Sequence, residues 1–376
     1  MVPTEHKGCG MSDIRLMKPY ITFEEVEAEF RAVFESGIFT RGENVEAFRR
    51  QIVEYTGAKH AFLMTSATTA LWTCLKLLGV GVGDEVIVSD FSFPASANVV
   101  EDLGATPVFA DVDLNTFNML SSELEKKITP HTKAVIFVDA LGNPTGVTEI
   151  KEICEKFHIP LIEDAACAIG SSENGRRCGS IADLTCYSFH PRKLISTGEG
   201  GAITTDRDDW AKWLEIKLFH GAKGMKGMAL DFVDYGYNFR LPELQAIMGR
   251  KQLAKIEDMV DERNRIRAAY IARLEPLGFV PQKIGKNVRH NVQSLVFKVP
   301  IGSDRDELIR ELRKAGVEST IGTYALSSGT YYVGKYANPQ KNATKLEQTT
   351  ITLPCFDGVD VKRVSSLLEI YCKAST

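Results

Sequence analysis

The feature that most constrains this fold is an alternation of short apolar runs with helical segments through the first two thirds of the chain. Five of the runs have the length and composition of strands: 60–65, 85–89, 106–110, 133–138 and 160–164. Segments with helical periodicity lie between them: 67–78, 95–103 and 148–157. This alternation predicts an α/β fold, with a mostly parallel central sheet flanked by helices.

Two further strands are expected at 185–190 and 201–205, with no long helix between them. Their closeness predicts a β-rich insertion or a local change of strand direction. Beyond residue 241 a long, charged helical stretch runs to Gly278. Strands and helices then alternate near four ranges: 293–299, 304–315, 317–321 and 361–371.

This change in the pattern of expected strands and helices predicts a second, smaller α+β domain. We expect a loose N-terminal arm over residues 1–10, a large domain over 11–250 and a small C-terminal domain over 251–376.

Composition excludes several classes of protein. The formal charge of −4 offers no basic field to a nucleic-acid backbone. No apolar run approaches the roughly 18 residues of a membrane helix, and the first ten residues lack the apolar centre of a secretion signal. Eight cysteines are scattered without a CxxC pair, and no HExxH occurs. We expect a cytoplasmic protein with free thiols, no metal, and no membrane or nucleic-acid partner.

Lys193 stands in the most informative segment, SFHPRKLISTGEGG, just after an expected strand. The glycines at 198, 200 and 201 allow other groups to approach the backbone closely. A lysine that forms a Schiff base must be held in such a fixed place. The alternative is an ordinary surface lysine in a loop.

Asp164 ends an apolar strand in LIEDAACAIG. Ligands of open α/β sheets bind at this edge, where a carboxylate can pair with a pyridinium nitrogen. The alternative is an aspartate that caps the next turn.

Two other segments follow strands. TSATTAL, at 65–71, opens a helix with small hydroxylated residues, which favours either phosphate binding or a plain N-cap. FSFPASAN, at 91–98, contains Phe93, an aromatic that lies either over a cofactor ring or in the core. A phosphate cup, a stacking aromatic, a pyridinium partner and a lysine amine at one sheet edge together make a site for pyridoxal 5′-phosphate (PLP).

With these motifs the chain resembles the sugar aminotransferases of the DegT/DnrJ/EryC1/StrS family, which have the PLP fold-type I architecture. The likeness runs from about Thr40 to Pro354 and is strongest in EDAACAIGS, SFHPRKLISTGEGG and GYNFRLPELQA. It implies that Lys193 and Asp164 are catalytic, with PLP as the cofactor and pyridoxamine 5′-phosphate (PMP) as its intermediate form. Lys193 would link covalently to PLP, and Asp164 would pair with its ring nitrogen.

The resemblance also implies a set of cofactor-binding residues: Ser66, Ala67, Thr68, Phe93, Asp164, Cys167, Ser188, Lys193 and Asn238. Phe93 would stack on the ring, and Asn238 would reach the phosphate from a neighbouring subunit, which implies a homodimer with shared active sites. Cys167 would lie near the ring hydroxyl of PLP, where members of the family commonly have glutamine or histidine. The expected substrate contacts are His190, Gln293 and Tyr324.

The function implied is transfer of an amino group from L-glutamate to a keto-deoxysugar. The sugar would be nucleotide-linked, with a 3-keto or 4-keto carbon, in amino-sugar biosynthesis for a surface polysaccharide such as an O-antigen or for a glycosylated metabolite. A keto-cyclitol (inosose-type) acceptor is one alternative. Two others are a PLP-dependent sugar dehydratase, in which histidine replaces the lysine, and a non-catalytic regulator, which would lack Lys193 or Asp164.

Overall fold

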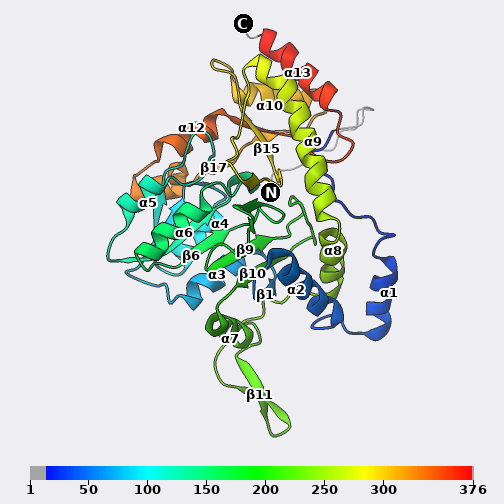
Figure 1. Cartoon of the computed structure of the whole chain (residues 1–376), viewed down its shortest axis with the longest axis vertical. Helices are drawn as coiled ribbons and strands as arrows, with labels where there is room; N and C mark the ends of the chain where they lie inside the picture. Colours follow the sequence, from blue (N-terminus) through cyan, green and yellow to red (C-terminus); the bar gives the residue numbers. More distant parts are fainter. Residues whose placement is uncertain (1–13, 375–376) are drawn as a thin grey trace.

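The computed structural model describes residues 14–374 (Figure 1), so the predicted arm over residues 1–10 lies outside it. Seven strands form the central sheet, in the order β1-β10-β9-β6-β5-β2-β4. Their bounds, in that order, are His60–Met64, Gly201–Thr205, Leu184–Ser188, Leu161–Asp164, Thr132–Val138, Glu85–Ser89 and Thr106–Ala110.

Strand β10 is the one reversed strand of this sheet. It pairs antiparallel with both β1 and β9, whereas β9, β6, β5, β2 and β4 pair in parallel. The predicted change of strand direction is therefore confirmed. Because the other six strands share one direction, their carboxyl ends meet at one edge.

Helices cover both faces of the sheet, as the alternation predicted. Val86 and Val88 pack in one core with α3 and α4, whereas Ile87 between them packs in another with α5 and α6. Two-sided burial explains why these strands are apolar throughout. The helices of this part are α2 (Glu43–Thr56), α3 (Ala67–Leu77), α4 (Ala95–Asp102), α5 (Ser121–Lys127), α6 (Val147–Lys156) and α7 (Asp208–Lys217).

The predicted long helix is divided into α8 (Glu243–Leu253) and α9 (Ile256–Leu274). Helix α9 leads along one side of the molecule to a second sheet in the upper part of Figure 1. That four-stranded sheet has the order β13-β15-β18-β16: Val280–Pro281, Leu295–Lys298, Thr350–Leu353 and Thr320–Ile321. It shares a core with α9, α10 (Arg305–Lys314) and α13 (Val361–Ala374). The domain boundary near residue 250 stays a prediction.

The remaining elements are short or peripheral. The hairpin β11–β12 (Ala222–Lys226 and Ala229–Phe232) projects below α7 in Figure 1. The other helices are α1 (Glu27–Ser36), α11 (Thr330–Tyr336), α12 (Lys341–Thr349) and the 3₁₀ turns η1 (Ala140–Gly142), η2 (Glu275–Leu277) and η3 (Leu326–Ser328). The other strands are β3 (Phe91–Ser92), β7 (Ser172–Glu173), β8 (Arg176–Arg177), β14 (Val288–Arg289) and β17 (Tyr324–Ala325). Among the described residues, no helix combines the length and apolar character that crossing a bilayer requires.

Candidate active site

Asp164 is the last residue of β6 and is 6% exposed at the carboxyl edge of the sheet. Ser96 Oγ donates to Asp164 Oδ2 over 2.7 Å, and the Ala166 N–H donates to Oδ1 over 3.2 Å. Burial raises the pKa of Asp164, while these two donors and the positive charge of Lys193 oppose that rise. A buried carboxylate held in this way fits a protonated ring nitrogen as its partner.

Lys193 lies beside the predicted ring-hydroxyl position, because its Nζ is 3.0 Å from Cys167 Sγ. Asn291 Nδ2 donates to the backbone oxygens of Cys167 and Ile169, at 2.8 Å each. The structure thus brings Lys193 to the segment after β6, which carries both Asp164 and Cys167.

Gln293 supports the loop that carries Lys193. It is 3% exposed, its Oε1 accepts from the Leu194 N–H at 2.6 Å, and its Nε2 donates to the Arg192 oxygen at 2.7 Å. The guanidinium of the fully buried Arg263 in turn donates to the backbone oxygen of Gln293 at 2.9 Å. The oxygen and the nitrogen of the Gln293 side-chain amide therefore hold the backbone on either side of Lys193. This is a positioning role, and the contact of Gln293 with substrate stays a prediction.

The segment after β1 combines a helix cap with free amide groups. Ser66 Oγ accepts from the Thr69 N–H at 3.1 Å and caps α3, so the N-cap alternative is also true. Ala67 and Thr68 lie in the first turn of α3, where backbone N–H groups have no carbonyl partner within the helix. These two N–H groups therefore remain available to an anion. A Cβ on Gly201 would stand 2.6 Å from the Ser66 carbonyl carbon, so only glycine lets β10 approach this turn. These residues fit the phosphate of PLP.

The other predicted site residues are Phe93, Ser188, His190, Asn238 and Tyr324. Phe93 is 65% exposed, which argues against a core role, and its ring centroid lies 6.3 Å from that of Tyr324. Ser188 ends β9, and its Oγ accepts from the His190 N–H at 3.4 Å. Asn238 is exposed, and its contact with a neighbouring subunit stays a prediction. The roles of His190 and Tyr324 toward substrate likewise stay predictions.

Several contacts of the site have no clear signal in the sequence. Ser96 lies one turn beyond Phe93 in a segment already singled out, but nothing there marks it as a donor to Asp164. Asn291 and Arg263 act through backbone oxygens of segments far away along the chain. Such contacts depend on how the two sheets pack together.

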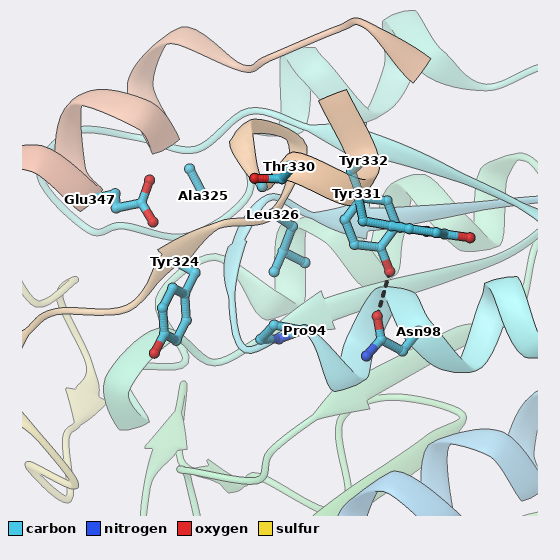
Figure 2. A pocket seen from close by; sticks show the side chains of 10 residues that line it. Pro94, Asn98, Tyr324, Ala325, Leu326, Thr330, Tyr331, Tyr332 and Glu347 are labelled. Atoms are coloured by element: carbon cyan, nitrogen blue, oxygen red, sulfur yellow. Dashed lines mark hydrogen bonds between the residues drawn. The ribbon is translucent and has the colours of Figure 1, made fainter. Parts of the chain in front are cut away.

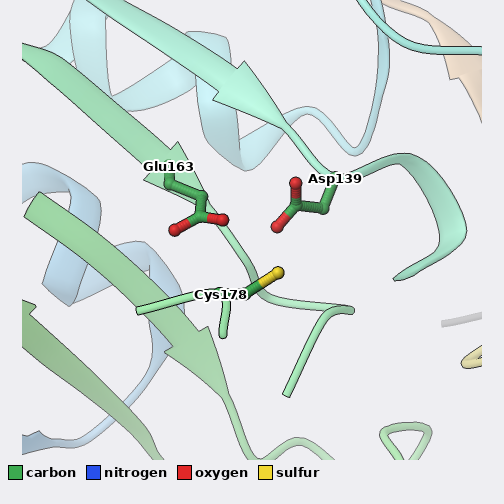
Figure 3. Close-up of side chains that lie close together, drawn as sticks. All are labelled: Asp139, Glu163 and Cys178. Atoms are coloured by element: carbon green, nitrogen blue, oxygen red, sulfur yellow. The ribbon is translucent and has the colours of Figure 1, made fainter. Parts of the chain in front are cut away.

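Behind the site, three fully buried groups point toward one another: Asp139, Glu163 and Cys178 (Figure 3). Their oxygen and sulfur atoms lie within 4.8 Å of one another, close enough for a metal ion, which the sequence did not suggest. Thr185 and the Gly179 N–H donate to Glu163 Oε2, which favours an ionised Glu163. Burial and the negative charge of Glu163 raise the pKa of Asp139 well above its ordinary value. We therefore interpret the cluster as a carboxyl pair in which Asp139 holds the proton.

This interpretation predicts a pH-dependent effect of Asp139→Asn on stability. Native Asp139 keeps a proton that the unfolded chain releases above about pH 3.8, so its contribution to stability falls as pH rises toward the raised pKa. Asparagine donates to Glu163 at every pH. We expect the Tm of the variant, relative to that of the unmutated protein, to increase by about 2 °C or more between pH 5 and pH 8.

The matched control is Asp258→Asn on the exposed face of α9, whose Tm difference should not change with pH. A constant difference for Asp139→Asn would contradict the shared proton. A Tm of the unmutated protein that falls when EDTA is added would instead indicate a bound metal.

Comparison with known proteins agrees with this site. The sequence model of the DegT/DnrJ/EryC1/StrS aminotransferase family matches residues 21–370. GDP-perosamine synthase of Caulobacter vibrioides is 32% identical over 96% of this chain and 99% of its own. Spore coat polysaccharide biosynthesis protein SpsC of Bacillus subtilis is 31% identical over 93% and 94%.

Solved structures show the same fold. That of Spr1654 from Streptococcus pneumoniae superposes with a TM-score of 0.91 at 28% identity, covering 96% of this chain and 98% of the other. The same protein is known in a PLP form and a PMP form, the two cofactor states expected here. The fold, the Lys193–Asp164 site and the match over residues 21–370 lead to one conclusion: the chain belongs to the DegT/DnrJ/EryC1/StrS family and is a PLP-dependent aminotransferase.

Proposed function

We propose that this enzyme transfers the amino group of L-glutamate to the 3-keto or 4-keto carbon of a nucleotide-linked deoxysugar. The observation that carries the proposal is the placement of the Lys193 amine beside Cys167 and within electrostatic reach of the buried Asp164. A dehydratase of this family would have histidine at position 193, and a non-catalytic relative would lack one of the two residues.

Each residue of the site has its own role in the proposed reaction. When bound, PLP supplies an electron sink for the carbanion that forms at the donor Cα. Lys193 would hold the cofactor between turnovers, and its free amine would remove the proton from that Cα. Asp164 supplies the negative charge that favours a protonated ring nitrogen, and the α3 N-terminus at Ala67 and Thr68 anchors the phosphate. In the second half-reaction Lys193 returns a proton to the aminated sugar carbon.

The name of GDP-perosamine synthase places a nucleotide-linked sugar in that relative, and this supports a similar acceptor here. We further propose a homodimer in which Asn238 of each subunit reaches the other subunit's phosphate site. The exposed position of Asn238 on the segment after the hairpin supports that role. The product would serve a surface polysaccharide or a glycosylated metabolite.

A nitrogen-15 experiment tests the reaction. We expect ¹⁵N from labelled L-glutamate to appear in the sugar, with one 2-oxoglutarate formed per amino sugar, because the two half-reactions are stoichiometric. Mass spectrometry of the sugar product and an enzymatic assay of 2-oxoglutarate measure both. D-glutamate serves as the control, since the site accepts one configuration at Cα.

The choice of acceptors separates the alternatives. Nucleotide-linked 3-keto and 4-keto sugars are offered beside a keto-inositol under identical conditions. Label in the inositol alone would replace the proposed acceptor by a cyclitol. Consumption of a keto-sugar without ¹⁵N uptake or 2-oxoglutarate would contradict amino transfer and favour dehydration.

A further inference from the structure

Figure 2 shows a pocket, of about 250 Å³, that is lined by Pro94 and Tyr324. Pro94 follows Phe93 in the chain, and the ring of Tyr324 contacts that of Phe93. The walls of the pocket come from the first turns of α4, from β17 and from the start of α11, and include Asn98, Tyr324, Leu326, Tyr331, Tyr332 and Glu347. A volume of this size is slightly below that of a typical small-molecule site and suits one ring system of a larger ligand.

The pocket is joined to the active site by backbone pairing. Tyr324 pairs with Ser92 in β3, the strand that leads directly into Phe93. Residues Phe93, Tyr324 and Tyr331 are 65%, 45% and 60% exposed, respectively. Flat exposed aromatic faces of this kind stack on planar ligands. The three aromatic residues form a series that leads from the predicted position of the cofactor ring into the pocket.

Buried hydrogen bonds hold the walls in place. Asp90 is fully buried and accepts from both the N–H and the Oγ of Ser327, at 2.7 Å each. Tyr332 donates to Asn98 Oδ1 over 2.6 Å, the contact drawn in Figure 2. The pocket is therefore formed before a ligand arrives, which lowers the entropic cost of binding.

Glu347, on α12, is the one charged side chain among the residues that line this described pocket. The Ala325 N–H donates to its carboxylate, and burial raises its pKa while Ala325 and Arg305 oppose that rise. An ionised carboxylate accepts hydrogen bonds at both oxygens and donates none. A ligand that fits must therefore present donors beside a flat ring.

We propose that this pocket is the nucleobase subsite and that Glu347 selects guanine. Guanine has two adjacent donors on its Watson–Crick edge, N1–H and the N2 amino group, which match the two carboxylate oxygens. Uracil, thymine, cytosine and adenine each present a single donor group there, next to acceptors that the carboxylate repels. The sugar attached to the base would then extend past Phe93 toward Lys193. This inference rests on the proposed nucleotide-linked acceptor.

The test measures binding of GDP, UDP, dTDP and CDP to the PLP-loaded enzyme by titration calorimetry. We expect GDP to bind at least about 10-fold more tightly than the other three, because hydrogen bonds to a charged group discriminate strongly. Equal affinities for the four nucleotides, or no detectable binding of any, would overturn the proposal without any variant being needed.

The substitution Glu347→Gln should weaken GDP binding about 10- to 100-fold. An amide offers one acceptor and one donor, which suits the N3–H and a carbonyl oxygen of uracil, so the preference should move toward UDP. Glu152→Gln, on the exposed face of α6, is the matched control and should keep the GDP preference. A Glu347→Gln protein that melts normally and still prefers GDP would contradict the role of Glu347.

The glutamate half-reaction of the unmutated enzyme separates this inference from the proposed function. If the enzyme forms 2-oxoglutarate from L-glutamate but does not prefer GDP, the guanine subsite is contradicted and the proposed amino donor is supported. An enzyme that forms no 2-oxoglutarate contradicts the proposed donor, whatever nucleotide it binds.

Discussion

Replacing Lys193 with alanine should reduce the turnover of amino transfer by at least about 10⁴-fold, while the protein still folds. Proton transfer by a positioned side chain alone contributes about 10²- to 10⁴-fold, and the proposed role of Lys193 includes that of the nucleophile. The side chain is half-buried in a loop that Gln293 holds through backbone atoms, so its removal leaves that support intact. The rate of 2-oxoglutarate formation from L-glutamate measures the effect.

Two control variants make this result specific. Lys193→Arg keeps the positive charge but should be equally inactive, because a guanidinium stays protonated and cannot act as a base. Lys126→Ala, on the exposed end of α5, should keep full activity. Near-normal turnover in Lys193→Ala would show that another group performs the chemistry.

Replacing Asp164 with asparagine should lower kcat by about 10²- to 10³-fold, the usual loss for one preorganised electrostatic contact. The amide keeps the size of the side chain and can still accept from Ser96 through its oxygen. It carries no charge, so it cannot favour a protonated ring nitrogen. Single-turnover rates with L-glutamate measure the loss at the step where the charge matters.

A purely structural effect of Asp164→Asn would lower the amount of bound cofactor rather than kcat. The bound cofactor is released with alkali and quantified, so that rates refer to loaded enzyme only. Asp258→Asn supplies the control for an exposed aspartate. A loaded Asp164→Asn enzyme with unchanged kcat would show that Asp164 does not act on the ring.

The central sheet was predictable because its strands are buried on both faces and alternate with helices. Burial leaves an apolar run that is visible in the sequence, as in β2 and β5. Strand β18 (Thr350–Leu353) was missed, since four residues with two threonines carry little signal by themselves. The predicted long helix breaks at 254–255, in a segment without proline or glycine, so tertiary packing decides that break.

The active site was predictable to the extent that it depends on the sheet edge. Asp164 ends strand β6 and the turn at Ser66 comes just after strand β1, so topology alone brings them to one edge. The Lys193–Cys167 contact and the positioning role of Gln293 depend on how a loop and the second sheet pack. The paired carboxyls of Asp139 and Glu163 were missed, because acidic residues at strand ends look like ligand contacts or caps.

The most direct test of the central claim is the absorbance spectrum of the purified enzyme before and after adding L-glutamate, recorded beside Lys193→Ala. A protein-bound lysine linkage to PLP gives a visible band. We predict that this band collapses into the near-ultraviolet band of PMP in the unmutated enzyme, and that the variant never shows the lysine-linked band. A visible band that ignores glutamate would contradict the proposed donor. Absence of a protein-bound band after PLP has been added and the unbound excess removed would contradict a Lys193-linked cofactor.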